Sequence, residues 1–278
     1  QSFVAEGIIA SGFVDGLNIT GNVFTTSKSG SPNSSYNWRN AVSINDTQNS
    51  QGLGRVDGSF VTISDNMFNG VVDIPASVFM RIGIDMDAGI GFISNNQITA
   101  GVHDIRVRFP TTTALSSATN TLIDGNILNG RGLELAVPNA SAGPITIRNN
   151  QINAIAGIND STTYPADLSL MRLIGNDQGI ALNVTGNSFI GYRGVLVQNF
   201  PGATFTGNNF LPASGASDFF SLVVSNKALN SGTAAAPLPM SISAFGNVFN
   251  GSGIVGAGRA VEFLNDNDAN GTATFGSL

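Results

Sequence analysis

Apolar and polar positions alternate along short stretches of this chain, and each stretch ends in the same kind of bend. In the octapeptide LNVTGNSF, Leu182 and Val184 alternate with polar neighbours, as in a strand with one buried face. The next two residues, Gly186 and Asn187, tolerate positive φ and bend the chain, and Phe189 then restores an apolar side chain. The octapeptide therefore predicts a short strand, a bend and a second short strand.

Near-copies of this octapeptide run through the whole sequence. Every copy has an Asn at the bend, preceded by Gly, Asp or Asn and followed two positions later by Phe, Ile or Leu. These marker asparagines are Asn22, Asn66, Asn96, Asn126, Asn150, Asn187, Asn208 and Asn247. Successive markers are 44, 30, 30, 24, 37, 21 and 39 residues apart, which indicates coils that carry loops of different length. We interpret the last copy, SISAFGNVF, as slipped in register at Phe245.

Between one bend motif and the next lies a second segment with strand character. These segments are residues 41–46, 81–87, 103–109, 131–137, 172–177, 193–199 and 259–265. Loops rich in Gly, Pro, Ser, Thr or Asn are predicted at 25–40, 47–58, 110–120, 157–168, 211–218 and 226–239. The shortest marker interval, 21 residues, is long enough for one coil of a parallel β-helix. The chain shows no sustained 3.6-residue apolar period with capping signals, so helices are not expected.

The sequence therefore predicts an all-β fold, a single right-handed parallel β-helix (β-solenoid) of about eight to nine coils over residues 17–278, with variable loops. Residues 1–16, which are largely apolar, are predicted to form an N-terminal capping or assembly strand. A further bend motif, TATFGSL, begins at Thr272 and stops at Leu278, without its Asn. We expect self-association, end to end or through the N-terminal strand.

The eight bend motifs resemble those of the right-handed parallel β-helix (pectin-lyase-like) superfamily, in which stacked asparagines occupy a strand bend and aliphatic and Phe side chains stack inside. That superfamily includes pectate lyases, polygalacturonases, tailspikes and secreted adhesins, so the resemblance implies a fold and leaves the activity open. The chain departs from its enzymes, because the catalytic signatures of pectate lyases, polygalacturonases and alginate epimerases are all missing.

Composition narrows the class of protein. The formal net charge of −6 argues against a nucleic-acid partner, which would require a basic stripe. The absence of cysteine excludes disulfides, thiolate zinc sites and cysteine nucleophiles. No apolar run approaches the roughly 20 residues that a membrane-spanning helix needs. The lack of Cys, the scarcity of Lys and the abundance of Ser, Thr and Asn favour an extracellular or cell-surface location.

The segment His103–Arg108 is the best candidate for an active centre. Strand alternation predicts that Asp104, Arg106 and Arg108 share an outer face, to which Asp85 and Asp87 of the preceding coil add carboxylates. A lyase acting on an acidic polysaccharide needs a base and cations that stabilise an enolate-like intermediate. In a second interpretation, Asp85 and Asp87 form half of a glycoside-hydrolase carboxylate pair, with Asp57, Asp65 or Asp124 as the partner. The lone His103 is equally consistent with a structural role.

An arginine recurs at the start of the second strand of many coils. The members of this set are Arg39, Arg81, Arg131, Arg172, Arg193 and Arg259. One interpretation is corner packing, in which Arg binds carbonyl groups and acidic neighbours. The other is recognition of an acidic polysaccharide, since guanidinium groups bind carboxylates in a bidentate manner. In that case Arg131 and Arg193, with Tyr36 and Trp38 in an early loop, are the candidate ligand-binding residues.

A candidate calcium site lies near the C-terminus. Asp266, Asp268 and Asn270 match the first half of a calcium loop, in which oxygen ligands alternate and Gly271 permits the turn. The bidentate Glu expected at position twelve is missing, so Glu262 or a neighbouring coil would have to complete the site. The alternative is a polar turn rich in Asn and Asp. Apart from calcium, no cofactor is expected.

Together these patterns favour a secreted or cell-surface structural or adhesive module that assembles head to tail into extracellular filaments. The alternative is a polysaccharide-active β-helix enzyme (lyase, hydrolase or tailspike-like depolymerase) that uses Asp85, Asp87, Asp104, Arg106 and Arg108. A module that binds a glycan without catalysis is the third possibility.

Overall fold

The structure, a computed structural model, describes residues 5–11, 16–25, 38–45, 59–70, 72–73, 77–78, 80–87, 89–101, 103–108, 121–136, 144–154, 169–175, 181–198, 200, 202–213, 218–225, 241–254 and 256–264. These residues form strands joined by bends and turns. They contain no helix, and so none that is long and apolar enough to cross a membrane. The prediction of an all-β fold is confirmed.

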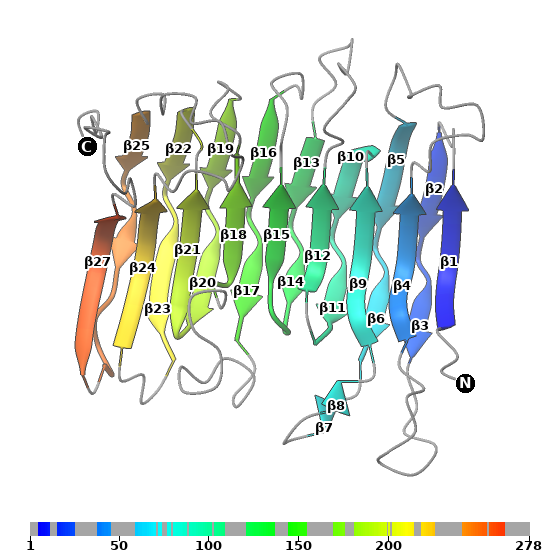
Figure 1. The fold of residues 1–278 in the computed structure, drawn as a ribbon, viewed down its shortest axis with the longest axis horizontal. Coiled ribbons are helices and arrows are strands. Elements are labelled where there is room, and N and C mark those ends of the chain that lie inside the picture. The colour runs from blue at the N-terminus through cyan, green and yellow to red at the C-terminus, as the bar shows by residue number, and fades with distance from the viewer. Residues whose placement is uncertain are drawn as a thin grey trace, which may run out of the picture.

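Three parallel sheets, named A, B and C, account for most of the strands (Figure 1). Sheet A consists, in spatial order, of β1 (Ala5–Ser11), β4 (Trp38–Asn45), β9 (Met80–Asp87), β12 (His103–Arg108), β15 (Leu133–Ala136), β18 (Met171–Ile174), β21 (Arg193–Gln198), β24 (Asp218–Ser225) and β27 (Ala257–Leu264). Sheet B consists of β2 (Leu17–Thr20), β5 (Ser59–Ser64), β10 (Gly89–Ser94), β13 (Thr121–Asp124), β16 (Ile145–Arg148), β19 (Leu182–Thr185), β22 (Gly202–Thr206) and β25 (Ser241–Phe245). Sheet C consists of β3 (Val23–Thr25), β6 (Met67–Asn69), β11 (Gln97–Thr99), β14 (Ile127–Leu128), β17 (Gln151–Asn153), β20 (Ser188–Gly191), β23 (Asn209–Pro212) and β26 (Val248–Phe249). A short antiparallel pair, β7 (Val72–Asp73) and β8 (Ser77–Val78), lies outside the three sheets.

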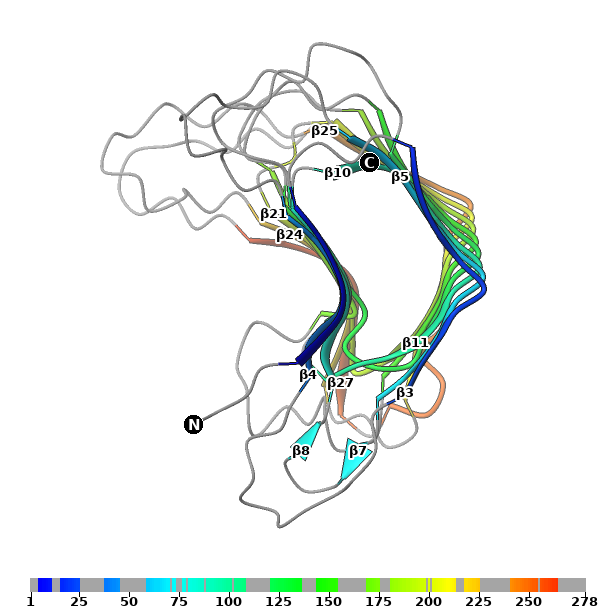
Figure 2. The ribbon, with the colours of Figure 1, turned by 90° about the vertical axis from the view of Figure 1, so that its right-hand side faces the viewer.

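The chain winds through the sheets in the constant order B, C, A, and after β1 it completes eight such coils within the described residues. In Figure 1 the chain rises along sheet A, passes behind and descends along sheet B while it advances toward the C-terminus. Viewed from the N-terminal end, as in Figure 2, this path runs clockwise away from the reader, which makes the helix right-handed. The structure confirms the prediction of a right-handed parallel β-helix of eight to nine coils.

The core is built from columns of equivalent apolar side chains, one from each coil. In sheet B, Ile63, Ile93, Ile123 and Ile147 pair in register and are buried. In sheet C the column contains Phe at both ends, and Phe24 stacks on Phe68 with ring centroids 4.7 Å apart. Burial of each such side chain stabilises the fold by roughly 1.5–3 kcal/mol relative to exposure. The alternation seen in the octapeptide therefore decides which face of each strand points inward.

The bend between sheets B and C requires a left-handed residue in every coil. The residue before each marker asparagine has φ between +54° and +69°. These residues are Gly21, Asp65, Asn95, Gly125, Asn149, Gly186, Gly207 and Gly246. Gly, Asn and Asp tolerate this conformation better than other residues, which explains why the sequence places them there.

Three local predictions are wrong. Residues 25–40 are not a loop throughout, since β3 includes Thr25 and β4 begins at Trp38, so Trp38 lies in a strand and not in the predicted early loop. Residues 211–218 are not a loop throughout, since β23 extends to Pro212 and β24 begins at Asp218. The last bend motif is not slipped, because Phe205 pairs with Ala244 and Thr206 with Phe245, in register with the earlier coils. Phe245 lies at an outward-facing position where the other coils have a polar residue. Because its side chain is apolar, the alternation in the sequence suggested a shift in register.

Replacement of Gly207 tests the bend conformation directly. A Cβ atom at this position would meet nothing within 4 Å, so the left-handed backbone is the main source of strain. We expect Gly207→Ala to lower the free energy of unfolding by about 1 kcal/mol. Gly207→Asn, which reproduces the residue found at Asn149, should cost clearly less; urea denaturation of both variants measures the difference. Equal costs would show that the left-handed conformation does not select these residues.

Candidate functional site

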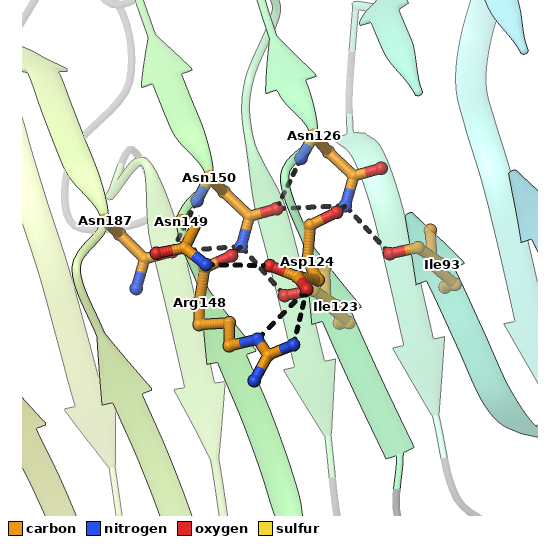
Figure 3. Close-up of polar contacts among 8 residues, drawn as sticks. All are labelled: Ile93, Ile123, Asp124, Asn126, Arg148, Asn149, Asn150 and Asn187. Carbon is orange, nitrogen blue, oxygen red and sulfur yellow. Dashed lines mark hydrogen bonds and ion pairs between the residues drawn. The ribbon is translucent and has the colours of Figure 1, made fainter. Parts of the chain in front are cut away.

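The eight marker asparagines form a continuous hydrogen-bonded row, here called the asparagine ladder; Figure 3 draws three of its rungs, Asn126, Asn150 and Asn187. In each interior rung, the side-chain Oδ1 accepts hydrogen bonds from the backbone N–H and the Nδ2 of the rung before it. For Asn126 these distances are 2.9 Å from both nitrogens of Asn96. Its own Nδ2 donates to the Ile93 carbonyl and to Asn150 Oδ1, each at 2.9 Å. The interior rungs are buried, so the ladder satisfies polar groups that water cannot reach.

Polar side chains also line the outside of the same bend. Arg148 donates from Nε and Nη2 to Asp124 Oδ2 at 3.0 and 2.8 Å, and Asn149 Nδ2 donates to Asp124 Oδ1 at 3.1 Å (Figure 3). The hydrogen bond from Arg148 lowers the pKa of Asp124 below its ordinary value. Asp124 belongs to sheet B and Asp65 to a bend, so neither lies beside Asp85 in sheet A. The structure therefore does not assemble the predicted hydrolase carboxylate pair from these residues.

Sheet A curves so that its outer surface is concave (Figure 2). Eight of the ten arginines of the chain lie in or directly beside the strands of this sheet. They are Arg39, Arg81, Arg106, Arg108, Arg131, Arg172, Arg193 and Arg259. The side chains of Arg39 and Arg81 are not described, but the other six concentrate positive charge on one surface of a net-negative protein, which makes the concave face the candidate functional site.

One outer row of sheet A alternates acid and base across four neighbouring strands. Asp85, Arg106, Glu134 and Arg172 pair successively in register. Arg106 Nε donates to Asp85 Oδ1 at 2.8 Å, while its Nη2 bonds Asp85 Oδ2. Arg172 Nη1 lies 3.4 Å from Glu134 Oε2. We call these residues the ion-pair row; their charges largely neutralise one another.

Asp85 is held closely within this row. Its side chain is almost fully buried and also accepts a hydrogen bond from Asn40 Nδ2 at 3.0 Å. Arg108 Nη2 lies 4.0 Å from Asp85 Oδ1. The structure thus brings together three of the predicted catalytic residues, Asp85, Arg106 and Arg108, as an ion-pair cluster rather than as an open acid or base.

Asp104 does not lie on the outer face, so its predicted position is wrong. The N–H groups of Asp104 and Ile105 both donate to the Gly132 carbonyl, a bulge that turns Asp104 inward. The buried carboxylate accepts hydrogen bonds from the N–H groups of Ala100 (2.8 Å), Gly130 (2.8 Å) and Gly132 (2.9 Å). Burial raises the pKa of Asp104 to about 7, and the three N–H donors oppose that rise. Asp104 therefore anchors the corner between sheets C and A.

The same bulge turns His103 outward toward the ion-pair row. Its Nε2 lies 3.7 Å from Glu134 Oε2. Burial lowers the pKa of His103, the Glu134 carboxylate opposes this, and Arg106, Arg172 and Arg131 lower it further. His103 and Glu134 form a partly exposed ionisable pair on the concave face. Sequence reasoning missed Glu134, although its place in LELA signals an outward position in a strand.

A second outer row of sheet A lies two residues before the paired core residues Leu133, Met171, Val195, Leu222 and Val261. Its positions in the last five strands are Arg131, Ser169, Arg193, Phe220 and Arg259. Arginine therefore recurs at every second strand, and we call Arg131, Arg193 and Arg259 the arginine row. Arg172 belongs to the ion-pair row, and Arg39 and Arg81 belong to neither row, since Asn40 and Ile82 occupy the equivalent positions of β4 and β9.

Phe220 lies between two members of the arginine row. The guanidinium carbons of Arg193 and Arg259 lie 5.6 and 5.0 Å from the centroid of its ring, within cation–π range. Arg259 also pairs with Glu262. Phe220 was missed because no strand was predicted at 218–225; the aromatic and β-branched residues of DFFSLVVS are the signal that could have found this strand.

Several predicted site residues fall where the structure gives no side-chain contacts. Tyr36, Asp57, Asp266, Asp268 and Asn270 lie outside the described residues. Trp38 begins β4, and Asp87 pairs with Arg108 in backbone register, but their side chains are not described. Within the described ranges, no group of three or more His, Cys, Asp or Glu side chains is arranged to hold a metal ion.

The calcium site stays a prediction. Titration of the metal-free protein with Ca²⁺ should release or absorb heat in a calorimeter and raise the melting temperature, because binding to the folded state alone stabilises it. EDTA should reverse the shift. A flat titration together with an unchanged melting temperature would reject the site at Asp266, Asp268 and Asn270.

No protein-family model matches the chain, no curated protein matches its sequence, and no solved structure matches its fold. The relation to the pectin-lyase-like superfamily therefore stays a prediction that rests on the bend motifs.

Proposed function

We propose that this chain is a secreted or cell-surface structural and adhesive module, which binds an acidic polysaccharide without cleaving it. The observation that supports the proposal most strongly is the arginine row on the concave face of sheet A. Guanidinium groups bind carboxylates and sulfates in a planar, bidentate manner that the ammonium group of Lys cannot reproduce. The extracellular location rests on composition, with no cysteine and two lysines in 278 residues.

The spacing of the arginine row suits an extended polymer. Neighbouring strands are about 4.8 Å apart, so arginines on alternate strands recur at about 9.6 Å along the helix axis. A linear polyanion lying along this axis would meet Arg131, Arg193 and Arg259 in turn. The ring of Phe220, between the last two, adds an apolar surface for the sugar ring.

The carboxylates of sheet A favour binding over catalysis. A general base must reach a substrate proton at hydrogen-bond distance. Asp85 is engaged by Arg106 and Asn40, and Asp104 is buried beneath the surface. The polysaccharide-active enzyme is the second candidate, and the His103–Glu134 pair is the observation that favours it.

Affinity electrophoresis tests this function. We expect polygalacturonate in the gel to retard the protein, neutral dextran to leave its mobility unchanged, and added salt to weaken the retardation by screening. The variant Arg131→Gln/Arg193→Gln should lose most of the retardation. The matched control Arg148→Gln, an arginine of sheet B, should keep it. Retardation that is absent, or lost equally in the control, would reject the arginine row as the binding surface.

A further inference from the structure

The ion-pair row does not stay charged to the end of sheet A. Arg172, its last member, pairs in register with Leu196 of β21, and Leu196 pairs with Val223 of β24. Leu196 lies between two buried residues of its strand and is itself partly exposed, so it points outward; Val223 has the same arrangement. Two strands of the concave face therefore present apolar side chains where the four preceding strands present charges.

Phe220 completes an apolar patch with these two residues. The two residues between Phe220 and Val223 are buried, so both side chains point outward from β24, about 10 Å apart along the strand. None of the three side chains packs against the hydrophobic core. We call Leu196, Phe220 and Val223 the apolar patch. A contiguous group of outward apolar side chains indicates a binding surface more strongly than a single one does.

Cations flank the apolar patch. Arg193 and Arg259 occupy the positions on either side of Phe220 in register, and both lie against its ring. Among the described residues no carboxylate pairs with Arg193, whereas Arg106 and Arg172 each face a carboxylate of the ion-pair row. The part of the concave face over β21, β24 and β27 therefore offers positive charge directly beside apolar surface.

We propose that the apolar patch is a subsite for O-acyl groups, so that the glycan bound by the concave face is an acylated polyuronate. This inference rests on the function proposed above and specifies the ligand of the same site. The arginine row binds the uronate carboxylates, and Leu196 and Val223 contact the methyl group of an acetyl ester. Moving that methyl group from water onto an apolar surface is favourable, whereas a free hydroxyl facing the patch would lose a hydrogen bond to water.

The chemistry of a polyuronate fits the two outer rows of sheet A. In polygalacturonate and alginate the sugars are joined through opposite carbons of the ring, so the carboxylate and the free hydroxyls project from opposite sides of the chain. A chain that lies along the helix axis with its carboxylates on the arginine row directs the hydroxyls of the same sugars toward the ion-pair row. Charged side chains there suit free hydroxyls as hydrogen-bond partners. Leu196 and Val223, which continue that row, suit acylated ones.

A matched pair of polymers tests the subsite. O-acetylated alginate and the same alginate after mild alkaline deacetylation share their backbone and carboxylates and differ in the acyl groups. Affinity electrophoresis over a range of polymer concentrations gives a dissociation constant for each. We expect the native protein to bind the acetylated polymer about fourfold more tightly, the ratio that corresponds to one buried methyl group. Partially acetylated dextran, which has acyl groups without carboxylates, should not retard the protein.

The double variant Leu196→Gln/Val223→Thr should remove the preference for the acetylated polymer. It leaves the arginine row intact, so it should bind deacetylated alginate as the native protein does, with an unchanged melting temperature. Val223→Thr alone, the milder change, should reduce the preference to about twofold. The matched control Ile127→Gln/Val248→Thr makes the same kind of change on the outer face of sheet C and should keep the full preference.

The two proposals fail in different ways. Equal binding of both alginates by the native protein would overturn the acyl subsite and leave the glycan-binding function in place. A preference that persists in Leu196→Gln/Val223→Thr would also overturn the subsite, because the acyl groups would then be recognised elsewhere on the protein. Retardation by neither polymer would reject the glycan-binding function and the subsite together.

Discussion

Replacing Asn126 by alanine should lower the free energy of unfolding by about 3–5 kcal/mol, because the variant leaves several buried polar groups without partners. The backbone N–H and Nδ2 of Asn96 lose their acceptor, and the Ile93 carbonyl loses a donor. Asn150 Oδ1 loses one of its donors as well. Urea denaturation, followed by circular dichroism, measures the change.

Two asparagines serve as controls. Asn183, exposed on the outer face of β19, should tolerate alanine with a change within about 0.5 kcal/mol. Asn22 is the first rung, and no preceding rung among the described residues donates a hydrogen bond to it. In Asn22→Ala, the backbone N–H of residue 22 still donates to Asn66 Oδ1. Asn22→Ala should therefore cost much less than Asn126→Ala. Equal costs at Asn22 and Asn126 would contradict the ladder as a source of stability.

Asn126→Asp separates hydrogen bonding from side-chain shape. The aspartate keeps one acceptor oxygen but turns the other toward the Ile93 carbonyl and Asn150 Oδ1, two further acceptors. The folded state then raises the pKa of the new carboxyl group, so stability should be lost as pH rises and partly regained in acid.

Removal of the Asp104 carboxylate is the second large effect that we expect. Asp104→Ala leaves the buried N–H groups of Ala100, Gly130 and Gly132 without an acceptor at the corner between sheets C and A. We expect the free energy of unfolding at pH 4 to fall by about 3 kcal/mol or more, since an unsatisfied buried donor costs about 1–3 kcal/mol.

The size of this loss should depend on pH. Burial raises the pKa of Asp104 from 3.8 to about 7, so between these values the folded protein binds more protons than the unfolded chain. The stability that the protonated group contributes is complete below the unfolded pKa and declines as pH rises toward the folded pKa. The difference between native protein and Asp104→Ala should therefore narrow from pH 4 to pH 7. A difference that widens over this range would show that the three N–H donors outweigh burial.

Asp124 provides a control of opposite sign. Its pKa is lowered, chiefly by the hydrogen bond from Arg148, so its contribution is present at neutral pH and is lost as pH falls below the unfolded value. Asp124 is partly exposed, and we expect Asp124→Ala to change stability only slightly.

The coils could be predicted because each bend has a distinct chemistry. Residues such as Asn149 and Gly186 adopt positive φ, the Asn that follows satisfies the buried backbone, and the next apolar residue re-enters the core. Those requirements are local in sequence, so eight copies could be aligned without knowledge of the structure. The spacing then determined the coil length.

The outer face was harder to predict because it depends on contacts between coils. The alternation of its own strand predicts that Asp104 faces outward. The bulge opposite Gly132 instead turns its side chain into the corner between sheets C and A. Glu134 accepts a hydrogen bond from Arg172, and the Phe220 ring lies against Arg193 and Arg259. Each of these arginines lies a coil or more away in the sequence. Alternation within one strand cannot reveal such partners.

The measurement that tests the proposed function most directly is product release from a bound acidic glycan. The protein is incubated for many hours with polygalacturonate or alginate, and unsaturated products are followed by ultraviolet absorbance while new reducing ends are assayed. Binding without cleavage predicts that both signals stay at the level of the protein-free control. Product formation by the native protein would contradict the non-catalytic role. If Glu134→Gln abolished that product formation but still bound polygalacturonate, the His103–Glu134 pair would be identified as an active centre.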